Sequence, residues 1–323
     1  MILSTTLTII IALCVLSLVV AASLSPIESM SWWAGWSEDD LEADETAPQQ
    51  TAAQSDAQFV IYLSGISTMA GHYLADQEAR FIEALRIRTP DAEIISDIFP
   101  YAPSGKPLLA APRILDRFWR AVLAMRLKGR GAVATLANLR NFFQVLVSAD
   151  QRYGPIFNLG AATVIIEALE RHGYQRGSGA PVTIIGFSGG AQVGLGATPF
   201  LTSTLAAPID IIALGGVMAS GDGPRAVRKI YRLVGARDVV QRLGALFFPE
   251  RWRLLDYSAW NEARRNGRIE KRRIGRMKHA GPEGYFGVHA YKEGVRYVDD
   301  TLDAVAAILR GDDSNKALDG KQR

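Results

Sequence analysis

Hydrophobic and polar positions along the chain follow two alternating periods. Short apolar runs bounded by turn-forming residues have the length of buried strands, and they lie at residues 59–63, 93–99, 182–185, 209–214 and 230–234. A further plausible strand lies near 269–277. Other segments repeat apolar residues at helical spacing, at residues 73–87, 156–172 and 293–310. Because strands alternate with helices, we predict an α/β fold with a mostly parallel sheet flanked by helices.

Residues 101–155 interrupt this rhythm. A loop that contains proline and glycine leads into two amphipathic helix candidates, near 111–128 and 132–148, which are dense in aliphatic and aromatic side chains. We expect the insertion to form a helical cap, at about 101–155, over the functional site. Ordinary packing of these helices against the sheet is the alternative.

Residues 1–24 carry no charged side chain. At about 1.5 Å per residue, a helix of this length crosses a hydrocarbon core of about 30 Å. The segment lacks the Lys or Arg with which a signal peptide normally begins, so we predict an uncleaved, single-pass N-terminal transmembrane helix and a membrane location. The alternative is a cleaved signal segment, with small residues at Ala21, Ala22 and Ser23, which would make the protein secreted or exported.

Charge is distributed unevenly along the chain. Residues 1–57 hold no Lys or Arg and eight acidic residues, so all 36 basic residues lie farther on. We interpret residues 25–57 as an acidic flexible linker, 58–310 as the folded domain and 311–323 as a polar tail. Basic residues are dense in 251–278, where they would bind anionic lipid head groups or form a solvated, salt-bridged surface.

The composition excludes some kinds of functional site. A single cysteine excludes a disulfide framework and a cysteine-built metal site, and the four histidines show no metal-ligand spacing. We therefore expect neither a metal nor a cofactor. No nucleic-acid recognition motif accompanies the basic residues, so nucleic acid is not an expected partner.

One sequence motif indicates a reactive side chain. The run Gly186-Phe187-Ser188-Gly189-Gly190 follows the β-branched strand at 182–185 and precedes small residues that open a helix. A sharp turn from strand to helix needs glycine on both sides of the serine, because side chains there would clash with the backbone. Such a turn lifts the serine hydroxyl above the sheet and aims helix N–H groups at the same point. The context predicts that Ser188 is a nucleophile.

With this motif, the chain resembles the α/β-hydrolase family of serine hydrolases over roughly residues 58–310. The resemblance implies an eight-strand type of sheet and a catalytic triad in the chain order serine, acid, histidine. Asp238 follows the strand at 230–234 and a glycine turn, so it is the preferred acid, with Asp222 as the alternative. His279 lies in a turn-rich segment after the last strand and is the preferred base, with His289 as the alternative.

The same resemblance implies an oxyanion hole built from backbone N–H groups. One donor is expected from Gly189, directly after the nucleophile, and the other from Ile66 in the loop after the first strand. The sequence lacks the HGGG-type stretch that often supplies the second donor in this family.

The implied activity is hydrolysis of carboxylic esters, lipid-like esters among them, through an acyl-enzyme intermediate. The expected partners are a small-molecule acyl ester or lipid substrate and the membrane that holds the N-terminal helix. A thioesterase has the same sequence features. The alternative from another class is a catalytically inactive, membrane-anchored member of the fold that acts as a binding or scaffold protein.

Overall fold

The computed structural model describes residues 25–27, 29–30, 32–34, 58–68, 74–104, 131–292 and 294–312. Outside these residues lie the expected transmembrane helix at 1–24, most of the linker, the expected helix at 111–128 and the tail from 313. Within the described part of the chain, no helix is both long enough and apolar enough to cross a membrane.

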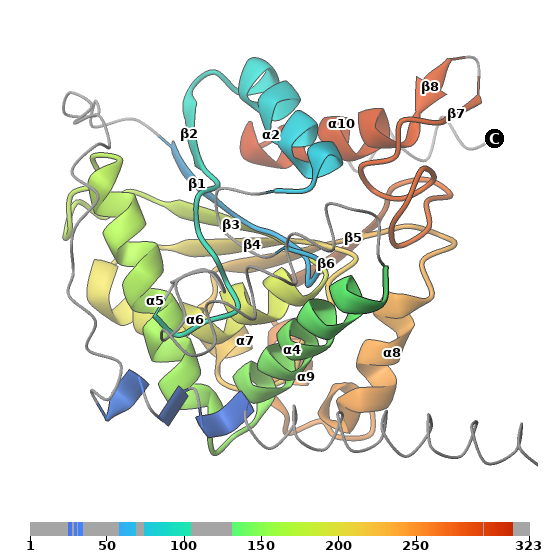
Figure 1. Cartoon of the computed structure of the whole chain (residues 1–323). Coiled ribbons are helices and arrows are strands. Elements are labelled where there is room, and N and C mark those ends of the chain that lie inside the picture. The colour runs from blue at the N-terminus through green and yellow to red at the C-terminus, as the bar shows by residue number, and fades with distance from the viewer. Residues whose placement is uncertain are drawn as a thin grey trace, which may run out of the picture.

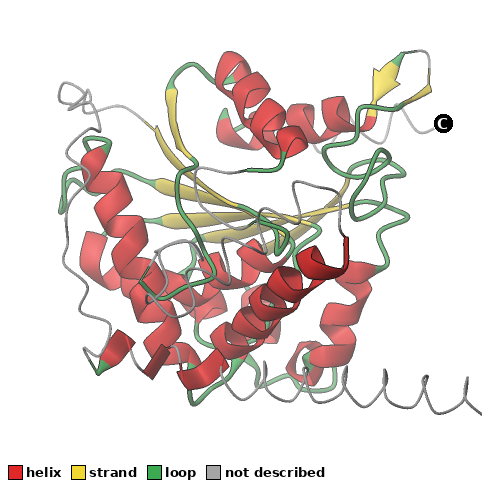
Figure 2. Ribbon diagram, in the orientation of Figure 1, coloured by secondary structure: helices red, strands yellow, loops and turns green. Residues whose placement is uncertain are grey.

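A six-stranded parallel sheet forms the centre of the domain (Figure 2). Its spatial order is β2-β1-β3-β4-β5-β6, and every neighbouring pair is parallel. The strands are β1 (Gln58–Leu63), β2 (Ala92–Ile95), β3 (Val182–Phe187), β4 (Ile209–Leu214), β5 (Lys229–Val234) and β6 (Ile269–Arg273). β3 and β4 are buried at every position, as expected for strands that are covered on both faces.

Helices cover both faces of the sheet (Figure 1). One face carries α2 (Asp76–Arg88) and α10 (Tyr297–Leu309), which contact each other. The other face carries α4 (Gly131–Ala149), α5 (Gly154–Arg171), α6 (Gly189–Leu205), α7 (Gly223–Ala226) and α9 (Ala259–Arg265). The short α8 (Val240–Phe247) and a 3₁₀ turn, η2 (Pro249–Arg251), lie between β5 and α9 in the chain, and a small antiparallel hairpin joins β7 (Ala290–Lys292) to β8 (Val295–Arg296).

Two apolar cores hold the layers together. The first packs alternate side chains of the strands, Ile61 and Ile184 among them, against α5 and α6. The second packs the intervening side chains, Val60 and Ile185 among them, against α2 and α10. The period of two along each strand therefore supplies both interfaces of a three-layer domain.

The prediction of an α/β fold with a parallel sheet and flanking helices is confirmed. The strand expected at 93–99 ends at Ile95, and Ile98 and Phe99 are buried by packing instead of strand pairing. An apolar run indicates burial, and it does not by itself indicate pairing. The described part of the sheet has six strands, fewer than the eight-strand type that the family resemblance implied.

The expected cap is described only in part. The helix expected at 132–148 is α4, and it packs against α5 and α6 in the same layer. For this half of the insertion, the structure therefore shows packing within the helical layer, while Val145 on α4 also reaches the position that a side chain at Gly189 would occupy.

Candidate active site

Ser188 lies in a strained turn between β3 and α6. Its φ of 53° and ψ of −117° belong to a region that non-glycine residues rarely adopt. A Cβ atom at Gly186 would lie 2.4 Å from the Ala191 Cα, and one at Gly190 would lie 2.4 Å from the Leu63 carbonyl oxygen. Neither position therefore has room for a side chain, which is the physical reason for the Gly-x-Ser-x-Gly spacing.

Ser188, His279 and Asp238 form one hydrogen-bonded chain. The Ser188 Oγ lies 2.9 Å from the His279 Nε2. The His279 Nδ1 lies 3.1 Å from each carboxylate oxygen of Asp238. Ser188 comes from the end of β3, Asp238 from the turn after β5 and His279 from the loop after β6, so the chain runs along one edge of the parallel sheet. The structure thus brings together the three side chains that the sequence analysis preferred.

Several hydrogen-bond donors hold the Asp238 carboxylate in place. The Oδ1 of Asp238 accepts hydrogen bonds from the Val240 N–H at 2.9 Å and the Gln241 N–H at 3.4 Å, which are the first N–H groups of α8. The Oδ2 accepts the Tyr285 hydroxyl at 2.9 Å. Burial by itself would raise the pKa of Asp238, but these donors and His279 together hold that pKa below its usual value, so the group is a carboxylate at neutral pH.

Tyr285 is a residue that sequence reasoning missed. Its hydroxyl accepts the Gly235 N–H at 2.9 Å and donates to Asp238, so it connects the acid loop to the segment after His279. Burial, and after it the charge of Asp238, raises the pKa of this hydroxyl, which keeps its proton available for donation. Nothing in the sequence distinguishes this tyrosine from the others, because its role depends on a contact across 47 residues.

The imidazole of His279 is held in a defined plane. The Phe187 ring stacks on it at a centroid distance of 5.3 Å, and Tyr285 meets it edge-on at 6.4 Å. Gly215, with a φ of 55°, leaves room for the pair formed by His279 and Asp238, because a Cβ there would lie 2.6 Å from the Asp238 Oδ2. The ring is therefore oriented by packing as well as by the carboxylate.

The loop after β1 lies beside the serine. The Ile66 Cγ2 is 3.0 Å from the place that a Cβ of Gly189 would occupy. Asn141 on α4 donates to the carbonyl oxygens of Ile66 and Thr68 at 2.8 and 2.7 Å, which fixes the loop from the side of the helices. The structure places Ile66 next to Gly189; that their N–H groups bind an oxyanion stays a prediction.

A buried carboxyl supports the same loop from the other face of the sheet. Glu78 on α2 accepts the Tyr62 hydroxyl at 2.7 Å and also a hydrogen bond from the Gly65 N–H. Burial raises the pKa of Glu78 to about 7, against the opposing effect of these two donors. Sequence reasoning gave no signal for this group, because an acidic residue in the first turn of a helix is ordinary.

The alternative residues lie elsewhere. Asp222 precedes α7, is 85% exposed and pairs with Arg225 at 3.7 Å. His289 is exposed near the β7–β8 hairpin, and His172 binds Glu93 at 2.8 Å. His72 lies outside the described residues.

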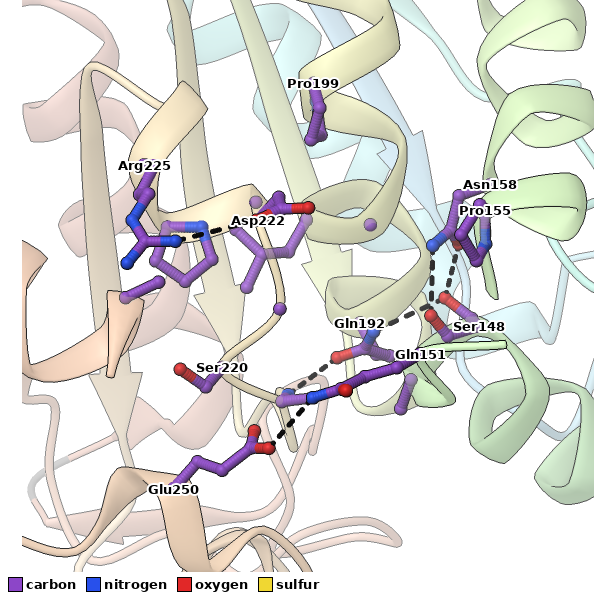
Figure 3. A pocket seen from close by; sticks show the side chains of 18 of the residues that line it. Ser148, Gln151, Pro155, Asn158, Gln192, Pro199, Ser220, Asp222, Arg225 and Glu250 are labelled. Carbon is purple, nitrogen blue, oxygen red and sulfur yellow. Dashed lines mark hydrogen bonds and ion pairs between the residues drawn. The ribbon is translucent and has the colours of Figure 1, made fainter. Parts of the chain in front are cut away.

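A separate cavity of about 510 Å³ opens between α5, α6 and the loop after β4 (Figure 3). Gln192 and Ser148 line it, and the Gln192 Oε1 accepts the Ala219 N–H at 2.7 Å. Ser148 in turn donates to Asn158 at 2.7 Å. Ser188 and its two partners are not among the lining residues, so this cavity is distinct from the hydrogen-bonded chain.

No protein-family model matches this chain, and no curated protein matches it. Among the described residues, no group of three or more His, Cys, Asp and Glu side chains has an arrangement that could hold a metal ion.

Proposed function

We propose that this protein is a serine hydrolase of the α/β-hydrolase type, which cleaves carboxylic esters through an acyl-enzyme intermediate. The observation that carries the proposal is the continuous chain from the Ser188 Oγ through both nitrogens of His279 to the Asp238 carboxylate. A hydroxyl is a weak nucleophile by itself, and an imidazole within hydrogen-bond reach activates it by removing its proton. The strained backbone at Ser188 and the buried carboxylate support the same conclusion.

The proposed reaction has two halves. In the first, the Ser188 Oγ attacks the carbonyl carbon of the ester while the His279 Nε2 takes the hydroxyl proton. The N–H groups of Gly189 and Ile66 stabilise the oxyanion of the tetrahedral intermediate, and Asp238 stabilises the imidazolium. His279 then protonates the leaving alkoxide, and the acyl group stays on Ser188.

In the second half, the His279 Nε2 takes a proton from water as the water oxygen attacks the acyl carbon. The second tetrahedral intermediate collapses, the proton returns to the Ser188 Oγ and the carboxylic acid leaves. The side chains of the triad supply every proton transfer. Thioesters fit the same scheme, with a thiolate as the leaving group.

We further propose that residues 1–24 anchor the enzyme in a membrane. The charge-free length of the segment supports this proposal. An anchored hydrolase would act on esters at or near the bilayer, lipid-like esters among them.

Turnover of short p-nitrophenyl esters by the purified full-length chain tests the hydrolase proposal. Ser188→Ala is expected to lower kcat by a factor on the order of 10³ or more, since members of a triad act as a unit. Ser203→Ala is the matched control, because Ser203 is exposed on α6, the helix that follows Ser188, and donates to the Phe200 carbonyl oxygen. Unchanged turnover in the Ser188 variant would refute the proposal.

A further inference from the structure

Five basic side chains meet at the β6 edge of the sheet. Arg232 on β5 pairs in register with Lys271 on β6, and Val234 pairs with Arg273. Residues two apart on a strand, and residues paired across strands, point to the same face of a sheet. Arg232, Lys271 and Arg273 therefore share one face, the face covered by α9, since the Arg232 guanidinium lies 5.5 Å from the centroid of the Trp260 ring.

Two further arginines complete the group. Arg251 of η2 lies over the same Trp260 ring at 4.2 Å, and Arg242 projects from α8. We call Arg232, Arg242, Arg251, Lys271 and Arg273 the α8 cation cluster. The pKa of Lys271 is lowered first by burial and then by the positive charges of Arg232, Arg273 and Arg242, which act on it because they are close.

The α8 cation cluster has no carboxylate partner within the described ranges. Neighbouring basic residues do have one: Arg265 pairs with Asp256 at 2.6 Å, and Arg268 pairs with Glu262 at 3.6 Å. Arg251 is only 9% exposed: its Nη1 donates to the Met218 carbonyl oxygen at 2.9 Å and its Nε has no acceptor. Burial and the charge of Arg232 lower its pKa to about 9. Arg242, Lys271 and Arg273 are exposed and carry charge of one sign, so a bound anion would reduce their mutual repulsion.

An exposed apolar stripe runs along the neighbouring helix. Val239, Leu243, Leu246 and Phe247 are spaced so that they fall on one side of α8, and they are 42–67% exposed. We call these four residues the α8 stripe.

We infer that the α8 cation cluster and the α8 stripe together form a docking surface for an anionic lipid bilayer. The exposed members Arg242, Lys271 and Arg273 would bind phosphate head groups, and the apolar side chains would enter the interfacial layer. Binding of a soluble phosphate ion would leave the apolar side chains of the α8 stripe exposed to water. An acidic protein partner is the alternative, and its binding would not depend on the charge of a lipid bilayer.

The position of the surface connects it to the hydrogen-bonded chain of the candidate active site. The Val240 and Gln241 N–H groups, at the start of α8, donate to Asp238. A bilayer that meets α8 therefore lies next to the acid loop, and the surface would present Ser188 with acyl esters from the membrane. The docking surface itself does not depend on hydrolysis.

The test uses the full-length chain in lipid nanodiscs with an environment-sensitive label. Cys14 is the only cysteine, so a Cys14→Ser background allows one NBD label at Leu246→Cys on the stripe. Ile87→Cys, 75% exposed on α2 at the opposite face of the sheet, is the matched control (Figure 1). We expect an NBD blue shift at residue 246 in discs that contain phosphatidylglycerol but not in pure phosphatidylcholine, and no shift at residue 87. Adding Lys271→Gln and Arg273→Gln should remove most of the shift.

Three results would overturn the inference: no shift at residue 246 in either lipid, an equal shift in both lipids, or an equal shift at residue 87. Turnover of a water-soluble ester in the same samples reports the hydrolase proposal separately. A protein that shows the shift but does not hydrolyse the ester would therefore refute the proposed function and support the docking surface.

Discussion

Two histidines follow the last strand of the parallel sheet, and only one of them reaches Ser188. The His279 Nε2 lies 2.9 Å from the serine oxygen, whereas His289 is exposed near the β7–β8 hairpin. We therefore expect His279→Ala to lower kcat/KM for ester hydrolysis by a factor on the order of 10³ or more, and His289→Ala to change it less than about threefold. Steady-state assays of both variants measure this difference, and the reverse ranking would reassign the base.

Glu78 gives the stability of the protein a dependence on pH. Its pKa rises from 4.5 to about 7 in the folded protein, mainly through burial, so the folded state holds a proton that the unfolded state releases. The contribution of Glu78 to stability is then highest below about pH 4.5 and falls as pH rises to about 7, by roughly 3 kcal/mol at about 1.4 kcal/mol per pKa unit. Glu78→Gln should reduce this fall, because the amide does not titrate.

Urea unfolding at pH 5 and pH 7 measures the Glu78 contribution. Glu83→Gln on the same helix is the control, since Glu83 is 69% exposed, and it should keep the full difference between the two pH values. A difference that is the same in the Glu78 variant and the wild type would show that Glu78 does not titrate in this range.

At the residue scale, the nucleophile could be predicted because its signal is local. Five consecutive residues and a preceding strand specify the turn at Ser188. Asp238 and His279 could be preferred over Asp222 and His289 only through the family resemblance and the order along the chain. Tyr285, Glu78 and Gly215 could not be predicted, because each acts through a contact between segments that are distant in sequence.

At the scale of elements, the turn from β3 to α6 depends on two glycines that have no room for a side chain. Gly186→Ala would place a methyl group 2.4 Å from the Ala191 Cα and 2.5 Å from its nitrogen, so α6 must move away from β3. We expect a loss of stability of about 1–3 kcal/mol, typical of overpacking, and a larger loss of turnover as Ser188 leaves its strained conformation.

Thermal unfolding and ester turnover of the Gly186 variant measure both effects. Gly221→Ala is the matched control, because a Cβ at Gly221 has no atom within 4 Å, and we expect it to leave both quantities near those of the wild type. A Gly186 variant as stable and as active as the wild type would show that the turn from β3 to α6 is not sterically constrained.

Other elements show what a hydrophobic pattern can and cannot predict. Strands β1, β3, β4 and β5 and helices α2, α5 and α10 agree with the expected segments to within a few residues, because burial on both faces gives a strong local signal. Helix α8 was not predicted, since its apolar residues face solvent and do not pack in a core. The basic run at 251–278 divides in the structure into paired side chains, such as Arg265 and Arg268, and members of the α8 cation cluster.

For the whole molecule, the parallel sheet explains why residues from positions 188, 238 and 279 meet. Parallel strands place their carboxyl ends at one edge, so the loops after β3, β5 and β6 converge there even though 91 residues separate the serine from the histidine. Recognition of the strands predicts that these loops converge, whereas the choice of Asp238 and His279 within them came from the family resemblance and the order along the chain. The strand order and the packing of α4 depend on interactions across the whole domain, which no local pattern reports.

The central claim is that Ser188 is an activated nucleophile, and covalent labelling tests it most directly. The full-length chain is treated with a fluorophosphonate, and the modified residue is identified by mass spectrometry of its peptides. We expect a single adduct on Ser188, which is absent in Ser188→Ala and strongly slowed in His279→Ala. No adduct on the folded wild-type protein, or an adduct on another serine that persists in Ser188→Ala, would contradict the account.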